Sequence, residues 1–458
     1  MKNTYSKYNI RIHRTGNAIR RWTQQHCSAY TFAVLVGIII GVLTGGCAWL
    51  LKLMISAVSH LLIGNGGNGA DWLLLVLPLT GILLVVAYQH FILRRNIEHG
   101  VEQVQQHLRD GRFRLGNKMV YAPLIASTLT LGFGGSAGSE GPIATTGSAI
   151  GSGVGRFFGM THAQLRVMIG IGAGAGIAGI FKAPIGGALF TIEVLMLEMT
   201  TLPVITLIIS CIASSMTAYA LSSCTYDINV AHQVIFDTSI IPWVFVLGVL
   251  CGIYSVYYSW IMKHLSRFFE KISNIWFRAI FSGIILSVCV FLFPSLYGEG
   301  YNTLTQLLNG DKTVLTAESL FYALHSDPTI VILLLAGLLA AKPAAACSSN
   351  SGGGVAGDFA PTLFAGGMFG FLFALAANTW FGAELTTAGF AYIGMAGVMA
   401  GAIRAPLMAM FLTAEMCDGY QFLLPLLIAV TISYCIVKAT ANDKRGKTTD
   451  TPIKMPGK

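Results

Sequence analysis

The chain has 458 residues, of which 54% are hydrophobic and only 11% are charged, and its mean hydropathy is +0.67. This composition excludes a set of soluble domains and is typical of a membrane protein with several spans. The net charge of +9 does not indicate nucleic-acid binding, because the positive residues cluster at the termini and in two loops, as cytoplasmic loops require. Nine scattered cysteines without a Cys-x-x-Cys pair predict neither a disulfide framework nor a zinc site.

The chain begins with a basic segment. Residues 1–29 carry six Lys or Arg and no acidic residue, which predicts a cytoplasmic location. Within this segment, residues 5–22 form either a basic amphipathic surface helix or a polar tail. Two apolar runs, about 30–55 and 72–93, follow and are long enough to span a bilayer. The turn between them has almost no positive charge, so we expect it on the outside.

The sign of the loop charge alternates along the rest of the chain. Residues 94–118 and 263–278 are basic and are predicted to lie in the cytoplasm. The loops 223–241 and 294–328 carry mainly acidic charges and are predicted to lie outside. Between residues 119 and 221 the apolar segments are short and punctuated by glycines, which is expected for tilted or half-membrane helices.

The stretch from Gly134 to Pro142 places one carboxylate, Glu140, among glycines inside this apolar region. Pro142 suits the first turn of a helix, and the apolar run after it supplies that helix. The unpaired N–H groups at a helix start attract anions. Glu140 is therefore an anion tethered at an anion site, which it either occupies or leaves so that a free anion enters. The alternative is a structural carboxylate that caps its own helix.

Two segments in the second half repeat patterns of the first half and indicate an internal repeat. The segment Gly357–Pro361, like Gly134–Pro142, places glycine and proline directly before an apolar helix. The segment Gly172–Glu193 recurs as Gly394–Glu415 without a gap. The matched positions are Lys182-Ala183-Pro184 with Arg404-Ala405-Pro406, and Glu193 with Glu415. Interrupted helices at matching positions of two halves are the mark of a transporter built from a repeat, with the ion site at the repeat interface.

These motifs resemble those of the CLC chloride channels and chloride/proton antiporters of prokaryotic type. The resemblance covers roughly residues 30–440 and rests on Gly138-Ser139-Glu140-Gly141-Pro142, Gly357-Asp358-Phe359-Ala360-Pro361 and the two Ala-Pro helices. It implies an all-α polytopic membrane protein with the inverted-repeat CLC architecture and many tilted and half-membrane helices. It also implies a homodimer in the inner (plasma) membrane, with one chloride pore in each subunit.

The resemblance also divides the chain. Residues 30–440 form the transmembrane domain, with repeat one at about 71–222 and repeat two at about 279–438. Residues 1–29 and the tail 441–458 are expected in the cytoplasm, and the tail is expected to hold no CBS domains.

The resemblance implies that Glu140 is the external gate, a carboxylate that competes with the permeating anion and leaves when it is protonated. Further anion contacts are expected from Ser139, Gly141, Asp358, Phe359 and Ala360. Family members usually carry an apolar residue where Asp358 stands. We expect the Asp358 carboxylate to be turned out of the path or neutralised by Lys342.

The inner half of the expected pore departs from the family pattern. His99 stands in place of the family's anion-binding serine, and either donates an N–H group to the anion or has no anion contact. The family's pore tyrosine has no evident counterpart near the end of the chain. Val194 replaces the glutamate that passes protons in the antiporters, and we expect a structural role for the neighbouring Glu193.

Val194 therefore favours a passive chloride channel, and the alternative is a chloride/proton antiporter in which Glu198 or a water chain supplies protons. A fluoride exporter is a remote alternative. An intramembrane enzyme is also remote, because the sequence carries no Gly-x-Ser-x-Gly or His-Glu-x-x-His motif. Chloride is expected as the transported ligand, with no cofactor.

Overall fold

The computed structural model describes residues 28–64, 72–94, 97, 100–222, 228, 238–315 and 328–441. Over these residues the chain is helical and has no β-strand, so the all-α fold class is confirmed. Nearly all of the predicted basic segment, the tail from residue 442 onward and His99 lie outside the described residues.

The first half of the chain holds α2 (Ala29–Ile63), α3 (Leu73–Ala87), η1 (Tyr88–Leu93), α4 (Gly100–Arg109), α5 (Lys118–Gly132), α6 (Glu140–Phe157), α7 (His162–Phe181), α8 (Pro184–Leu189), η2 (Phe190–Val194) and α9 (Thr201–Leu221). The second half holds η3 (Thr238–Ile240), α10 (Ile241–Glu270), α11 (Ile275–Leu292), η4 (Pro294–Leu296), α12 (Tyr301–Leu308), η5 (Lys312–Leu315), α13 (Pro328–Ser351), α14 (Phe359–Phe381), α15 (Thr387–Ile403), α16 (Pro406–Met416), η7 (Tyr420–Phe422) and α17 (Leu423–Ala441).

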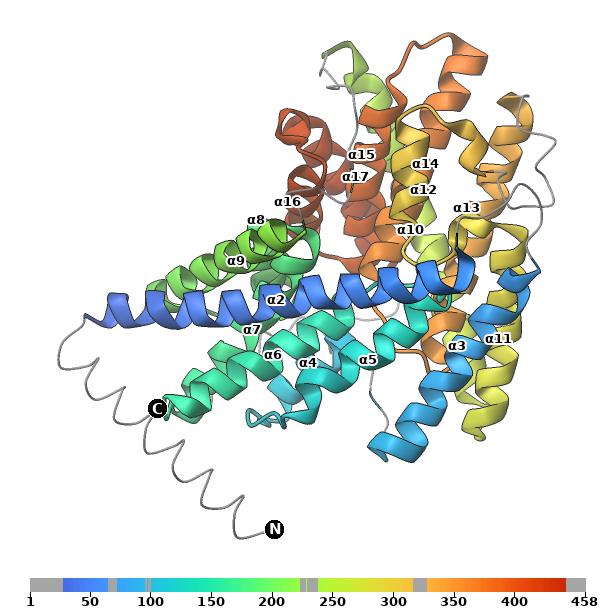
Figure 1. Ribbon diagram of the computed structural model, residues 1–458. Coiled ribbons are helices and arrows are strands. Elements are labelled where there is room, and N and C mark those ends of the chain that lie inside the picture. Colours follow the sequence, from blue (N-terminus) through green and yellow to red (C-terminus); the bar gives the residue numbers. More distant parts are fainter. Residues whose placement is uncertain are drawn as a thin grey trace.

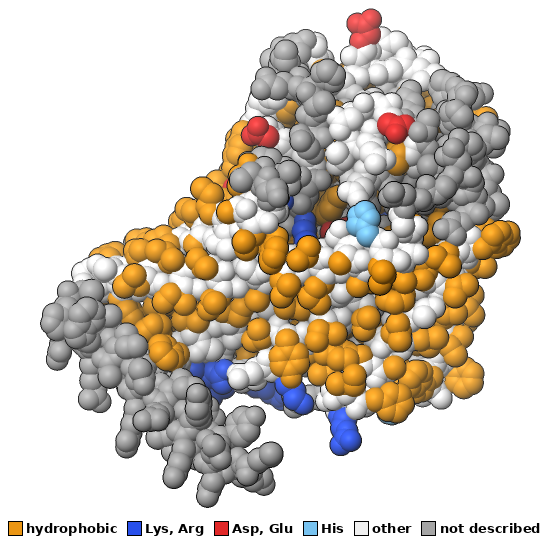
Figure 2. Space-filling view, viewed as in Figure 1, with side chains coloured by type: hydrophobic (Ala, Val, Ile, Leu, Met, Phe, Trp, Pro, Cys, Tyr) orange, Lys and Arg blue, Asp and Glu red, His pale blue; other side chains and the backbone are white. Residues whose placement is uncertain are grey.

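The helices are suited to a bilayer. By length and composition, nine helices among the described residues can cross a membrane. Figure 2 shows a broad apolar band across one face of the molecule, with Lys and Arg gathered along its lower edge and Asp and Glu above it. The protein is therefore a membrane protein with several spans, as its composition predicts.

The packing of the helices repeats between the two halves. In the first half α2 packs against α9, α6 against α7, and α7 against α8. In the second half α10 packs against α17, α14 against α15, and α15 against α16. The halves meet where α3 lies on α11 and α8 on α16 (Figure 1). The same set of contacts is thus built twice.

Small residues bring the paired helices close together. A Cβ at Gly147 of α6 would lie 2.1 Å from the carbonyl oxygen of Gly172 in α7. A Cβ at Gly366 of α14 would lie 2.3 Å from the carbonyl oxygen of Gly394 in α15. Close backbone packing through glycines is how membrane helices gain contact without a hydrophobic driving force.

The repeat extends to backbone angles. Lys182 ends α7 with φ 55° and ψ 34°, and Arg404 ends α15 with φ 64° and ψ 34°. Each is followed by an alanine and then by the proline that starts the next helix, Pro184 or Pro406. The left-handed residue stops one helix, and the proline, whose missing N–H is not needed there, starts the next.

Two carboxylates tie the halves together reciprocally. Both oxygens of Glu193 accept N–H groups at the start of α16, from Leu407 at 3.3 Å and from Met408 at 2.8 Å. Both oxygens of Glu415 accept N–H groups at the start of α8, from Ile185 at 3.0 Å and from Gly186 at 2.8 Å. Each repeat thus supplies the anion that the other's short helix needs at its positive end.

The loops that precede α6 and α14 cross at the centre of the molecule. The backbones of Gly138 and Gly357 exchange two hydrogen bonds, at 3.0 and 2.7 Å. Earlier in each loop, the N–H of Ser136 donates to Ser349 Oγ at 2.9 Å, and the N–H of Val355 donates to Thr130 Oγ1 at 3.0 Å. These four bonds relate equivalent positions of the two repeats, so each loop satisfies the polar backbone of the other.

A threonine pair on α5 tests this crossing. Thr130→Val is expected to lower the free energy of unfolding by about 1–3 kcal/mol, because it leaves the buried N–H of Val355 without its acceptor. Thr128→Val is the matched control, since the Thr128 hydroxyl bonds only the carbonyl of Leu124 in its own helix. Thermal unfolding of purified protein in detergent measures both variants, and equal losses would contradict the proposed importance of the crossing.

Candidate anion pathway

Glu140 lies at the crossing of the two loops, where its side chain is completely buried. Its Oε1 accepts the N–H of Phe359 at 2.5 Å and the N–H of Ala360 at 3.3 Å. These are the first N–H groups of α14, which carry the positive end of that helix. Oε2 has no hydrogen-bond partner among the described residues. The carboxylate of one repeat thus occupies the anion-attracting helix start of the other.

Two glycines make room for this carboxylate. A Cβ on Gly138 would lie 1.9 Å from Glu140 Oε2, and a Cβ on Gly357 would lie 2.4 Å from Oε1. Such contacts are closer than any side chain permits, so both positions need the missing side chain of glycine. The two glycine motifs together therefore form a cradle for one small anion or one carboxylate.

A second carboxylate occupies the start of α6. Oε1 of Glu299 accepts both the backbone N–H of Ser139, at 2.9 Å, and its hydroxyl, at 2.5 Å. Glu299 is half-buried and lies between two glycines with positive φ, Gly298 at 64° and Gly300 at 82°. The family resemblance implies an anion contact for Ser139, and in this structure the polar groups of Ser139 hold Glu299.

A buried lysine accompanies these two carboxylates. Lys342 of α13 is completely buried, and its Nζ donates to Ser136 Oγ at 2.8 Å. The ammonium also lies 4.8 Å from the ring centroid of Phe364 and interacts electrostatically with Glu299 and Glu140. It supplies positive charge on the side of Glu140 where the acidic loop residue Glu299 lies.

A cavity approaches the crossing from the side of the basic loops. Residues of α4, α10, α13 and α14 line it, including Glu102, Lys263, Asn350, Asp358 and Phe359, and its volume is about 470 Å³. Val194 lines the same cavity, and its backbone carbonyl accepts the Gln105 side chain at 2.8 Å. The cavity thus reaches the same helix start that holds Glu140.

The structure brings most of the predicted site residues together. Glu140, Gly141, Phe359 and Ala360 meet at the crossing, and Asp358 and Val194 lie in the cavity beside it. Glu193 instead holds the start of α16. His99 lies outside the described residues. The next residue, Gly100, packs closely on Gly141, because a Cβ added to Gly100 would lie 2.3 Å from the Gly141 Cα.

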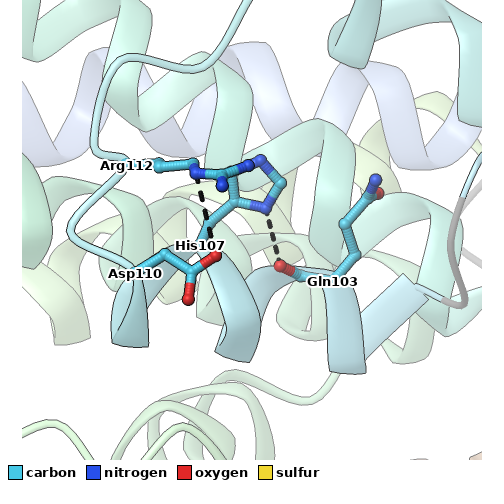
Figure 3. A network of polar contacts seen from close by, with 4 residues as sticks. All are labelled: Gln103, His107, Asp110 and Arg112. Carbon is cyan, nitrogen blue, oxygen red and sulfur yellow. Dashed lines mark hydrogen bonds and ion pairs between the residues drawn. The ribbon is translucent and has the colours of Figure 1, made fainter.

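Figure 3 shows the end of α4, at a separate cavity of about 350 Å³. His107 Nδ1 lies 2.7 Å from the carbonyl oxygen of Gln103, one turn earlier. Arg112 Nε lies 3.7 Å from Asp110 Oδ2, in an exposed ion pair of the kind that adds little stability. These contacts shape the basic loop and involve none of the residues at the crossing.

Sequence reasoning missed Glu299, Lys342 as a neighbour of Glu140, and Tyr258, a residue of α10 that also lines the cavity. The signal for Glu299 is its Gly-Glu-Gly setting, which repeats the setting of an acid between small residues seen around Glu140. Lys342 offered a different signal, because a lysine in an apolar span needs a partner. No pattern in the sequence places Tyr258 near Asp358.

Known proteins resemble this chain over most of its length. The sequence model of a family described as "Voltage gated chloride channel" matches residues 80–438. The chain is 28% identical over 440 residues to the "H(+)/Cl(-) exchange transporter ClcA" of Klebsiella pneumoniae, covering 92% of this chain and 88% of that protein. It is 27% identical over 425 residues to the "Voltage-gated ClC-type chloride channel ClcB" of Escherichia coli, covering 90% of this chain and 96% of that protein.

Two solved structures share the fold. One is a slow cyanobacterial Cl⁻/H⁺ antiporter, with a TM-score of 0.73, 23% identity and coverage of 91% of this chain and 95% of that chain. The other is a CLC-type fluoride/proton antiporter, with a TM-score of 0.70, 20% identity and coverage of 89% and 96%. At these identities the likeness shows the architecture, including the repeat.

The second carboxylate yields a prediction about anion access from its side of the molecule. Glu299→Gln keeps an oxygen for Ser139 but removes a negative charge, so anions that arrive from that side compete better for the helix start. The apparent affinity for chloride supplied on that side is expected to rise by about two- to fivefold, as expected for one partly exposed charge. Chloride flux in proteoliposomes, measured against the chloride concentration on each side, checks it. Asp311→Asn is the control, and the same rise in that variant would show a general surface effect.

Proposed function

Because the chain belongs to the voltage-gated chloride channel family, we propose that it carries chloride across a bilayer along a path that Glu140 closes, and that it exchanges chloride for protons. One observation carries this proposal. The Glu140 carboxylate is buried on the N–H groups of Phe359 and Ala360, where a permeating anion would bind.

Competition for these donors explains the gate. An ionised carboxylate and a chloride ion need the same N–H groups, so the two exclude each other at the start of α14. Protonation removes the charge of Glu140 and most of its attraction to the helix end. The neutral side chain then leaves, and the glycine cradle of Gly138 and Gly357 accepts chloride. Every opening of the path therefore involves a proton.

Exchange is favoured over passive conduction because the group that closes the path is itself the group that takes up the proton. The exchange transporter named among the relatives supports this choice. A passive channel is the second candidate, favoured by Val194 at the position of the family's proton-passing glutamate and by the channel named among the relatives. A fluoride exporter has less support than either candidate, because only a shared fold favours it.

The placement in the membrane follows from charge. We place the basic loops 100–118 and 263–278 in the cytoplasm, so the cavity beside Asp358 opens inward and Glu299 faces outward. Homodimeric assembly in the inner membrane stays a prediction from the family resemblance.

The exchange proposal is tested with purified protein in liposomes that hold a chloride gradient and a pH-sensitive dye. The expected result is uphill proton movement, opposite in direction to the chloride flux and at a fixed ratio. Glu140→Gln is the control that removes the proton-carrying group and should abolish the proton movement. Chloride flux without any proton movement in the parent protein would establish the passive channel instead.

The gate itself is tested by two substitutions that separate charge from size. Chloride flux of the parent is expected to rise as external pH falls, because protonation releases Glu140 from the helix start. Glu140→Gln imitates the protonated acid and should conduct chloride with its pH dependence largely gone. Glu140→Asp keeps the charge with a shorter reach, so it should impair closure but keep a pH response.

Flux measured across an external pH series gives both results. Parent-like rate and pH response in Glu140→Gln would make Glu140 a structural cap and would place the gate elsewhere.

A further inference from the structure

Helix α10 carries three tyrosines, and two of them are tied to α13. The hydroxyl of Tyr254 donates to the carbonyl oxygen of Leu339 at 2.9 Å, and the hydroxyl of Tyr257 donates to the carbonyl oxygen of Ala340 at 3.0 Å. The hydroxyl of Tyr258 has no hydrogen-bond partner among the described residues. The first two hydroxyls thus join helices, whereas the third has no such role.

The position of the third tyrosine points to a ligand. Only 2% of Tyr258 is exposed, and the residue lines the cavity of about 470 Å³ that reaches the start of α14. Its phenol interacts electrostatically with Glu140 and Asp358, so the hydroxyl lies toward the crossing. A buried hydroxyl without a partner is costly, and in native proteins such a group usually marks a bound water, ion or ligand.

The surroundings of the hydroxyl favour an anion as this ligand. Phe359, the first residue of α14, lines the same cavity, and the first turn of a helix carries partial positive charge. A phenol hydroxyl is a hydrogen-bond donor, so an anion in the cavity gains from the donor and the helix end together. The exposed Lys263, also on α10, adds positive charge to the lining. Asp358 is not the acceptor of the Tyr258 hydroxyl, and its Oδ1 accepts the Asn350 side chain at 2.7 Å.

We propose that Tyr258 is an anion-binding residue, and that its hydroxyl donates to a small monovalent anion held in the cavity beside the start of α14. The proposal rests on the proposed transport of chloride and assigns a residue to one of its steps. An anion beside Tyr258 lies on the inward side of Glu140, before the N–H groups that Glu140 occupies. Tyr258 thus provides a binding step that precedes the opening of the gate.

Calorimetric titration of the purified protein with chloride, in chloride-free buffer, tests the contact. Tyr258→Phe removes only the hydroxyl, and it is expected to weaken chloride binding by about tenfold, the loss for one hydrogen bond to a charged group. Tyr254→Phe is the matched control, because Tyr254 is also a buried tyrosine of α10 but its hydroxyl bonds Leu339. This control should bind chloride as the parent protein does.

Crystals of the parent protein soaked in bromide test the place of the anion directly, even if Tyr258→Phe does not fold. The expected result is an anomalous signal within hydrogen-bond distance of the Tyr258 hydroxyl, and a weaker signal in crystals of Tyr258→Phe. Three results would overturn the proposal. They are unchanged chloride affinity in Tyr258→Phe, an equal loss of affinity in Tyr254→Phe, and a water molecule instead of bromide at the hydroxyl.

Binding and transport separate this inference from the proposed function. If the parent protein moves chloride without protons, or moves no chloride in liposomes, the proposed function fails. The titration and the bromide signal then still decide whether Tyr258 binds an anion. If the parent protein exchanges chloride for protons and Tyr258→Phe binds chloride as tightly as the parent, exchange stands and the role of Tyr258 is refuted.

Discussion

The structure depends on two loops that must satisfy their backbone groups where a bilayer offers no water. Neither loop does so alone. Gly138 and Gly357 bond to each other, Ser136 bonds to Ser349, and Val355 bonds to Thr130. The pseudo-symmetry of the chain is therefore an energetic requirement, because each repeat supplies the partners that the other lacks. The position of Glu140 follows, since the same crossing brings the first N–H groups of α14 to its side chain.

Carboxylates from elsewhere in the chain occupy four helix starts, and the way each is held separates structural from movable groups. Glu193 and Glu415 use both oxygens, each on a separate N–H group. Glu140 uses one oxygen, and its other oxygen is buried without a partner. Glu299 also uses one oxygen, on the two donors of one serine. All four accept at least two hydrogen bonds, but Glu140 alone keeps a buried oxygen with no partner among the described residues, and a carboxylate satisfied so incompletely suits the proposed gate.

Much of this could be predicted from the sequence, because the informative signals were local. The pairs Lys182-Ala183-Pro184 and Arg404-Ala405-Pro406 encode a left-handed stop followed by a proline start, so their recurrence predicts the repeat. The cradle around Glu140 is likewise readable from adjacent glycines. The contacts of Glu299, Lys342 and Tyr258 were not predictable, because each joins segments far apart in the chain. The Gly-Glu-Gly setting of Glu299 and the apolar span around Lys342 mark these two residues, but they do not indicate which groups the side chains contact.

Position 358 shows how a departure from pattern changes the chemistry of the inner pathway. Val194 stands where the family resemblance places a proton-passing glutamate, and Asp358 adds a titratable group to the same cavity. A permanent negative charge beside the start of α14 would oppose the anion affinity that the helix end provides. Lys342, the neutralising partner expected from the sequence, donates instead to Ser136 and interacts with Glu140 and Glu299. An acid at position 358 therefore acts directly on the charge balance at the start of α14.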